Sequence, residues 1–168
     1  MKLQNRAVVA VAVFTVVGSG LIGGILFAFS NFVMSALALQ PAACGIRTMQ
    51  EINIQIVNPL FLAIFVGTPV AAVFLGALAI RSFSQPGAKL LLLGSGLYLV
   101  GTLAVTLAFN IPLNNQLAIQ DALSIDATPH WIQYVAKWIM WNHVRTIASL
   151  MAAALLTLAI RQIPSREN

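Results

Sequence analysis

Four long apolar stretches alternate with short polar connections along the chain. A helix needs about 20 residues to cross the hydrocarbon core of a bilayer, and the stretches match that length or exceed it. The pattern predicts an all-α fold, a four-helix transmembrane bundle that forms a single integral membrane domain over residues 1–168. The predicted spans are residues 7–38, 59–80, 89–111 and 143–161. The first run is about twice the length of a signal-peptide core, so we interpret it as a retained span.

The helices are predicted to extend beyond the bilayer on one side, the outer side. The first apolar run is longer than a bilayer requires, and the third span is expected to continue through Pro112 towards Leu117, with a kink because proline lacks an N–H donor. The segment from Pro129 to Ile160 reads as one long helix. Thr128 is its predicted N-cap and Pro129 its first helical residue.

A short amphipathic helix is predicted between the first and second spans. Its apolar side chains recur at helical spacing: Ile46, Met49, Ile52 and Ile56. Such a helix lies at the membrane interface with its apolar side buried. Asn58 followed by Pro59 then predicts an N-cap and a proline start for the second span.

Composition agrees with a membrane protein, since 60% of the residues are hydrophobic and 8% are charged. The net charge of +5 does not indicate nucleic-acid binding, because the basic residues are scattered at span ends without a basic stripe. Cys44 is the only cysteine, so the chain has no intramolecular disulfide and no Cys-x-x-Cys redox pair.

The basic residues predict the orientation. One side of the predicted bundle carries most of them: Lys2, Arg6, Arg81, Lys89, Arg161 and Arg166. By the positive-inside rule this side faces the cytoplasm, so both termini are predicted to be cytoplasmic, in a bacterial inner membrane. The outer side carries an aromatic belt: Trp131, Tyr134, Trp138 and Trp141.

Small residues predict where helices approach closely. Gly20 and Gly24 in the first span form a small-xxx-small pair, and Gly94 and Gly101 recur at a spacing of seven in the third. We expect these faces to pack against neighbouring helices, and a homo-oligomer is compatible with the pattern.

Most asparagines fall at the outer ends of the spans: Asn31, Asn53, Asn58, Asn110, Asn114, Asn115 and Asn142. For each one alone, an interhelical hydrogen bond that stabilises the bundle is a sufficient explanation. Taken together, they predict a shared polar, substrate-binding pocket on the outer side. No ionisable residue is expected deep in a span, which counts against a pump or a proton-coupled transporter.

The segment around Trp138, Trp141 and Asn142 is the richest in candidate chemistry. With Trp131, Tyr134 and Arg145 these residues share one stripe of a helix, whereas His143 points to nearly the opposite face. The tryptophans can stack on a substrate or simply form the aromatic belt. Arg145 is either a site residue or an interfacial anchor.

His143 has three readings: a catalytic base, a metal or haem ligand, or a structural histidine. His130 is the only other histidine and lies thirteen residues away, with no carboxylate at ligand spacing. A zinc or di-iron site is therefore not expected.

Several of these segments resemble the anthrone oxygenase-like family of small four-span membrane proteins. The resemblance rests on five segments: residues 27–34, 49–53, 58–61, 109–115 and 141–145. It implies a helical bundle, and some fungal members of the family oxidise anthrones to anthraquinones with O₂ and no evident cofactor.

Two functions follow as hypotheses. The first is a cofactor-independent oxygenase for an anthrone-like, aromatic or quinol-like lipophilic substrate, with His143 as base and with Asn142 and Arg145 stabilising an oxyanion. The second is a non-catalytic lipid- or quinone-binding membrane protein or complex subunit. The expected partners are the bilayer and a small hydrophobic aromatic compound, and no nucleic acid.

Overall fold

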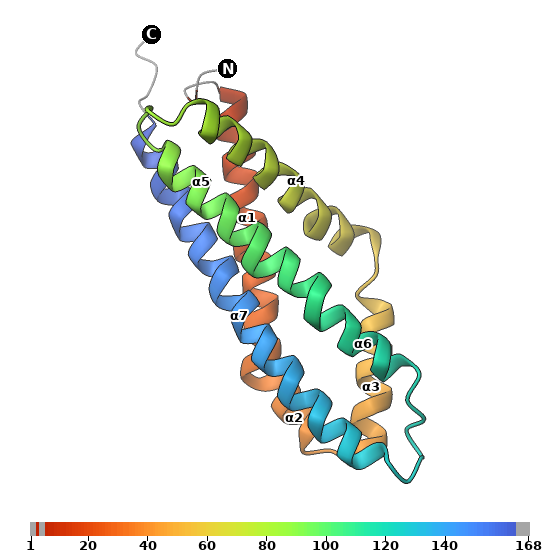
Figure 1. Ribbon diagram of the computed structural model, residues 1–168. Coiled ribbons are helices and arrows are strands. Elements are labelled where there is room, and N and C mark those ends of the chain that lie inside the picture. Colours follow the sequence, from red (N-terminus) through yellow and green to blue (C-terminus); the bar gives the residue numbers. More distant parts are fainter. Residues whose placement is uncertain (1–2, 4–5, 164–168) are drawn as a thin grey trace.

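The computed structural model describes residue 3 and residues 6–163, and all regular structure in this part of the chain is helical (Figure 1). The first span is continuous through α1 (Arg6–Ala28), η1 (Phe29–Val33, a π-helical turn) and α2 (Met34–Ala38). α3 (Ala42–Gln55) and α4 (Pro59–Arg81) follow. The third span joins α5 (Ala88–Leu97), the π-helical η2 (Tyr98–Ala104) and η3 (Thr106–Asn110), and α6 (Ile111–Ala118). α7 (Ala127–Gln162) is the last helix of the described residues.

The four predicted spans are confirmed. Four helices are long and apolar enough to cross a membrane: Arg6–Ala38, Pro59–Arg81, Ala88–Ala118 and Ala127–Gln162. The third and fourth are longer than their apolar cores, as predicted, because their polar ends stay helical. The protein is therefore an integral membrane four-helix bundle whose helices project past the apolar core at one end.

The third span contains two π-helical segments and a proline. The helix continues through Pro112, and the turns before it, η2 and η3, are π-helical. Because proline has no N–H, the turn before it is a natural place for a widened hydrogen-bond pattern. The predicted continuation past Pro112 is confirmed, with η3 ending two residues and η2 eight residues before it, and the predicted kink stays a prediction.

The local predictions for helix starts are confirmed at one site and wrong by two residues at another. Asn58 caps α4, accepting a hydrogen bond from the Phe61 N–H at 3.0 Å. α7 begins at Ala127 after Asp126, so Thr128 lies inside the helix and is not its N-cap. Proline is tolerated throughout the first turn of a helix, so the position of Pro129 does not determine at which residue α7 begins. Pro129 is the third residue of α7 and not the first.

The amphipathic helix α3 is confirmed. Ile46 and Met49 are buried, and Arg47 and Glu51 are exposed. A Cβ added at Gly45 would lie 2.7 Å from the Trp131 ring, so α3 packs closely on the start of α7.

Glycine packing is confirmed in the third span and wrong in the first. A Cβ added at Gly94 would lie 2.9 Å from Leu156 Cγ, and one at Gly101 would overlap Ala148. Gly20 and Gly24, in contrast, have no neighbour within 4 Å of such an atom. The buried stripe of α1 instead includes Gly18 and Gly23, which lie two residues before Gly20 and one residue before Gly24.

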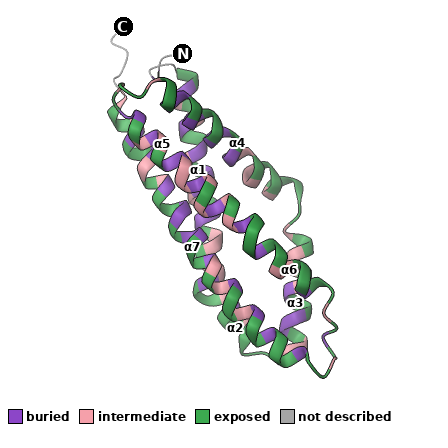
Figure 2. Cartoon of the chain, viewed as in Figure 1, coloured by how far each residue is buried: buried purple, intermediate pink, exposed green. Residues whose placement is uncertain are grey.

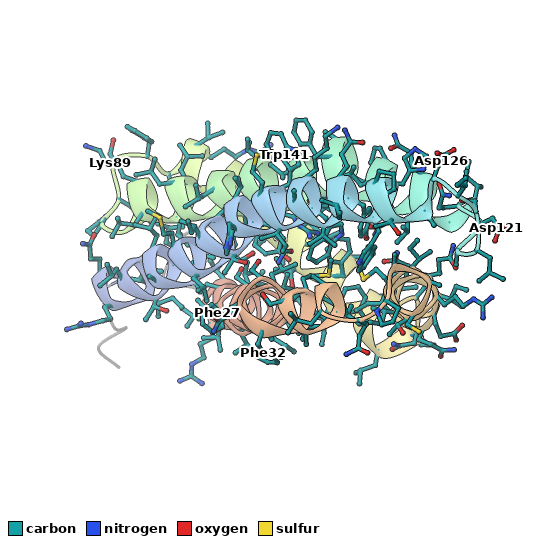
Figure 3. All side chains as sticks on the ribbon, turned by 90° about the horizontal axis from the view of Figure 1, so that it is seen from below. Phe27, Phe32, Lys89, Asp121, Asp126 and Trp141 are labelled. Carbon is teal, nitrogen blue, oxygen red and sulfur yellow. The ribbon has the colours of Figure 1, made fainter. Side chains whose placement is uncertain are left out.

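The molecule has two distinct ends. The start of α1, the α4–α5 turn and the end of α7 meet at one end (Figure 1), which we call the basic end; its charges are Arg6, Arg81, Lys89 and Arg161. Lys2 and Arg166 lie outside the described residues. The opposite, asparagine-rich end carries α3 and the 119–126 loop, and Figure 3 shows Lys89 and Asp121 at the two extremes. Which end faces the cytoplasm stays a prediction.

Candidate functional site

The centre of the bundle holds a charged side chain. Arg145 is only 5% exposed and Asn142 is fully buried. The guanidinium donates from Nη2 to Asn142 Oδ1 and from Nη1 to Thr106 Oγ1 at 3.3 Å. The Asn142 amide in turn donates to Ser30 Oγ and to the Leu26 carbonyl oxygen on the first span. We call Arg145, Asn142, Thr106 and Ser30 the arginine cluster.

Arg145 is buried inside the bundle at the middle of α7, and its depth in the bilayer stays a prediction. Arg145 is the nineteenth of the 36 residues of α7, so more than four turns of helix separate it from either end. The hydropathy pattern had placed it near the start of an apolar core. The expectation that no ionisable residue lies deep in a span therefore stays a prediction, as does the argument against charge-coupled transport that rests on it.

The partners of Arg145 are electrically neutral. The carboxylates in the described part of the chain, Glu51, Asp121 and Asp126, are all exposed. The Nε atom of Arg145 is buried and has no hydrogen-bond partner. A guanidinium presents five N–H donors and stays charged, and an unpaired charge in an apolar interior is costly. The cluster therefore has unused donor capacity and favours an oxygen atom that carries negative charge.

Aromatic rings bound the arginine cluster on the side of the asparagine-rich end. The guanidinium carbon of Arg145 lies 5.3 Å from the centre of the Trp138 ring. The ring of Phe29 lies against the same indole, with the two ring centres 5.8 Å apart. Asn114 Oδ1 accepts hydrogen bonds from Trp138 Nε1 at 2.9 Å and from the Tyr134 hydroxyl at 3.0 Å. The predicted stripe on α7 is confirmed for its buried members, and Figure 2 shows buried positions along this helix: Trp131, Tyr134, Trp138, Asn142 and Arg145. Trp141, which the prediction also included, is only half-buried.

Two further predicted residues lie close to this wall. Asn110 is 1% exposed, and its amide donates to the Trp138 carbonyl oxygen at 3.3 Å while its own Oδ1 has no partner. Asn53 on α3 is half-buried beside the Tyr134 hydroxyl, and its Nδ2 is buried without a well-formed hydrogen bond. The structure thus brings Asn53, Asn110, Asn114, Asn142 and Trp138 to one half of the interior.

The other candidates lie elsewhere. Asn31 and Asn115 are exposed beside the inward-facing Ser30 and Asn114, and Asn58 is used as a helix cap. His143 is exposed, on the side of α7 that faces away from Asn142 and Arg145. Successive residues of a helix point about 100° apart, so neighbours of a buried residue readily face outward.

Trp141 does not join the Trp138 wall. Its ring stacks on Phe109 with the ring centres 3.6 Å apart and the planes at 7°. Figure 3 shows Trp141 at one side of the molecule, with Phe27 and Phe32 of the first span at the other.

Sequence reasoning missed the hydroxyl groups of the interior. Ser30 and Thr106 complete the arginine cluster, and Thr102 Oγ1 lies 2.8 Å from Ser149 Oγ one turn further towards the basic end. The signal was present, since Thr102, Thr106, Asn110 and Asn114 follow one another at intervals of four. Ser and Thr are common in transmembrane helices, which made that signal easy to overlook.

The described residues contain no group of three or more His, Cys, Asp or Glu side chains placed to hold a metal ion. His130 Nδ1 is 2.9 Å from Gln120 Oε1 at the asparagine-rich end, far along α7 from His143. The use of a cofactor stays untested.

Comparisons with known proteins bear on this arrangement. No curated protein and no solved structure matches the chain. The family model described as anthrone oxygenase matches residues 60–155, more than half of the 168 residues. The match includes the segments around Asn110 and Asn142, whereas segments 27–34 and 49–53 lie outside it. The chain therefore belongs to the anthrone oxygenase family.

Proposed function

We propose that this protein is a membrane-embedded oxygenase that oxidises an anthrone-like or quinol-like aromatic substrate with O₂ and without a cofactor. Membership of the family supports an oxygenase-type reaction. The observation that carries the finer proposal is the buried guanidinium of Arg145, whose contacts are all with neutral groups. Such a cation stabilises an anionic oxygen far better than the same group in water, because the interior screens charge weakly.

The chemistry needs an anion. An anthrone and its phenol tautomer both ionise to the same delocalised anion, with most of its charge on one oxygen. That anion passes one electron to O₂, and recombination of the radical with superoxide and a proton gives a hydroperoxide. Loss of water then leaves the carbonyl group, so CH₂ and O₂ become C=O and H₂O. Stabilising the first anion is what the protein has to supply.

Each residue of the cluster has a distinct part in the proposal. Arg145 binds the developing oxyanion, while Asn142 and Thr106 fix the direction of its guanidinium. Trp138 offers a ring face for stacking, and Asn110 has a free acceptor oxygen for a substrate hydroxyl. His143 has no part, because its side chain is on the outward face and ionisation through the phenol tautomer sends the proton to solvent.

The proposal is tested by turnover in lipid nanodiscs. O₂ uptake with dithranol is measured and corrected for spontaneous oxidation in empty nanodiscs. We expect Arg145→Gln to lower kcat/KM by roughly 10²- to 10³-fold, the usual effect of removing one oxyanion donor. Arg47→Gln, an exposed change on α3, is the matched control and should leave the rate unchanged.

Two results would count against this function. Equal rates for the wild-type protein and Arg145→Gln would show that Arg145 does not contribute to the reaction. A wild-type protein that binds quinones or lipid without accelerating O₂ uptake would favour the alternative of a non-catalytic binding protein.

A further inference from the structure

A pocket of about 200 Å³ lies between α6 and the first turns of α7, at the asparagine-rich end. Leu113 and Leu117 of α6 form an apolar wall, and Tyr134 of α7 contributes a buried ring. No member of the arginine cluster lines it. The pocket is therefore a second site, distinct from the interior one.

The polar lining of the pocket is rich in donors and carries positive charge. Gln116, Gln133 and Lys137 line it with exposed side chains. At the rim, His130 and Gln120 are joined by a contact of 2.9 Å. No carboxylate is among the lining residues. An ammonium and carboxamides around an apolar wall suit a ring that carries an acidic oxygen.

The pocket is connected to the interior through Tyr134. The hydroxyl of Tyr134 donates to Asn114 Oδ1, which also accepts from Trp138 Nε1. Trp138 in turn lies against the guanidinium of Arg145. A compound in the pocket would therefore contact Tyr134, which shares Asn114 with Trp138, the residue beside the guanidinium of Arg145.

We propose that this pocket binds a flat aromatic compound with an ionised oxygen group, a phenolate or a carboxylate, before the compound moves inward. Lys137 and the two glutamine amides hold the oxygen, while the leucine wall and the Tyr134 ring contact the aromatic system. The proposal rests on the proposed function for the identity of the ligand as a substrate. Binding in the pocket needs no turnover, so the two are tested separately.

The test measures equilibrium binding to the full-length protein in zwitterionic nanodiscs without turnover. The probes are anthraquinone-2-carboxylate, 1,8-dihydroxyanthraquinone at a pH at which it is ionised, and unsubstituted anthraquinone. We expect Lys137→Gln to weaken binding of the carboxylate by about 3- to 10-fold, as for loss of one hydrogen bond of ordinary strength at an exposed side chain, and to change binding of unsubstituted anthraquinone by less than about twofold. Gln133→Leu should act in the same direction, and Lys89→Gln at the basic end is the control.

The acidic probes identify the ligand group. A loss confined to the carboxylate assigns the pocket to carboxylates, and a loss shared by the ionised phenol includes phenolates. The proposal is overturned if Lys137→Gln weakens all three probes equally, or none of them. Selective binding without dithranol oxidation would support the proposed pocket and contradict the proposed oxygenase function. Dithranol oxidation without selective binding would support the oxygenase function and contradict the pocket.

Discussion

The two halves of the bundle are packed differently. In the half next to the basic end, helices meet through small and aliphatic side chains: Val8, Ala12, Leu75, Ala79, Leu91, Leu156 and Ala159. In the asparagine-rich half, the corresponding core contains Trp131, Tyr134 and Trp138, with the arginine cluster between that core and the aliphatic one. α4 is buried in the first half only, since none of its residues from 59 to 67 is buried.

This difference separates stability from function. Small residues allow close helix contact, which is one of the ways in which helices associate in a membrane. In the asparagine-rich half, Arg145 Nε and Asn110 Oδ1 are buried without a hydrogen-bond partner, so a donor and an acceptor remain for a ligand. We infer that the basic half stabilises the bundle, while the asparagine-rich half carries the site.

The largest effect on activity short of removing Arg145 itself is expected from Asn142→Ala. Asn142 accepts from the guanidinium and ties α7 to the first span. Losing a hydrogen bond to a charged group is worth about 1.5–3 kcal/mol, which corresponds to about a 10- to 100-fold fall in kcat/KM. The measurement is dithranol oxidation per folded molecule, with the exposed Asn115→Ala as control. Equal activity of the two variants would show that orientation of Arg145 does not matter.

A substitution in the half next to the basic end is expected to lower stability and to leave activity nearly unchanged. Gly94→Leu places a side chain against Leu156 and should destabilise the protein by about 1–3 kcal/mol, as overpacking does, with little change in activity per folded molecule. Gly96→Leu, two residues away with open space around it, is the matched control. Unfolding in a detergent titration measures the difference. If both variants are equally stable, the close packing of this half is not what holds it together.

The smallest effect is expected from His143→Ala. The imidazole is exposed on the outward face of α7, so its removal should leave dithranol oxidation within about twofold, the ordinary range for an exposed site away from the chemistry. A fall of tenfold or more in kcat, at unchanged folded yield, would restore the histidine as the base.

Features that depend on neighbouring residues or on the helical repeat could be predicted from the sequence. The spans, α3, the Asn58 cap and the inward stripe of α7 each depend on a few neighbouring residues or on one helical repeat. The segments around Asn110 and Asn142 also carried the family resemblance, and the family match covers both.

Features that depend on which faces of the helices pack against one another could not be predicted from the sequence. The first span has glycines on several faces, at 18, 20, 23 and 24, and composition alone does not tell which ones pack inward. The same ambiguity made Asn31 a candidate in place of its neighbour Ser30. The role of Arg145 was left open between a site residue and an interfacial anchor, because its burial is set by the helices that surround α7.

The most direct test of the central claim is the ionisation of a bound ligand. The absorbance of 1,8-dihydroxyanthraquinone reports whether its phenol is ionised, and it can be titrated on wild-type protein and on Arg145→Gln. A cation beside the bound phenol favours the phenolate, so the wild-type midpoint should lie at least about one pH unit lower than that of the variant, equivalent to ~1.4 kcal/mol. Identical midpoints in the two proteins would contradict the claim that Arg145 stabilises an anionic oxygen.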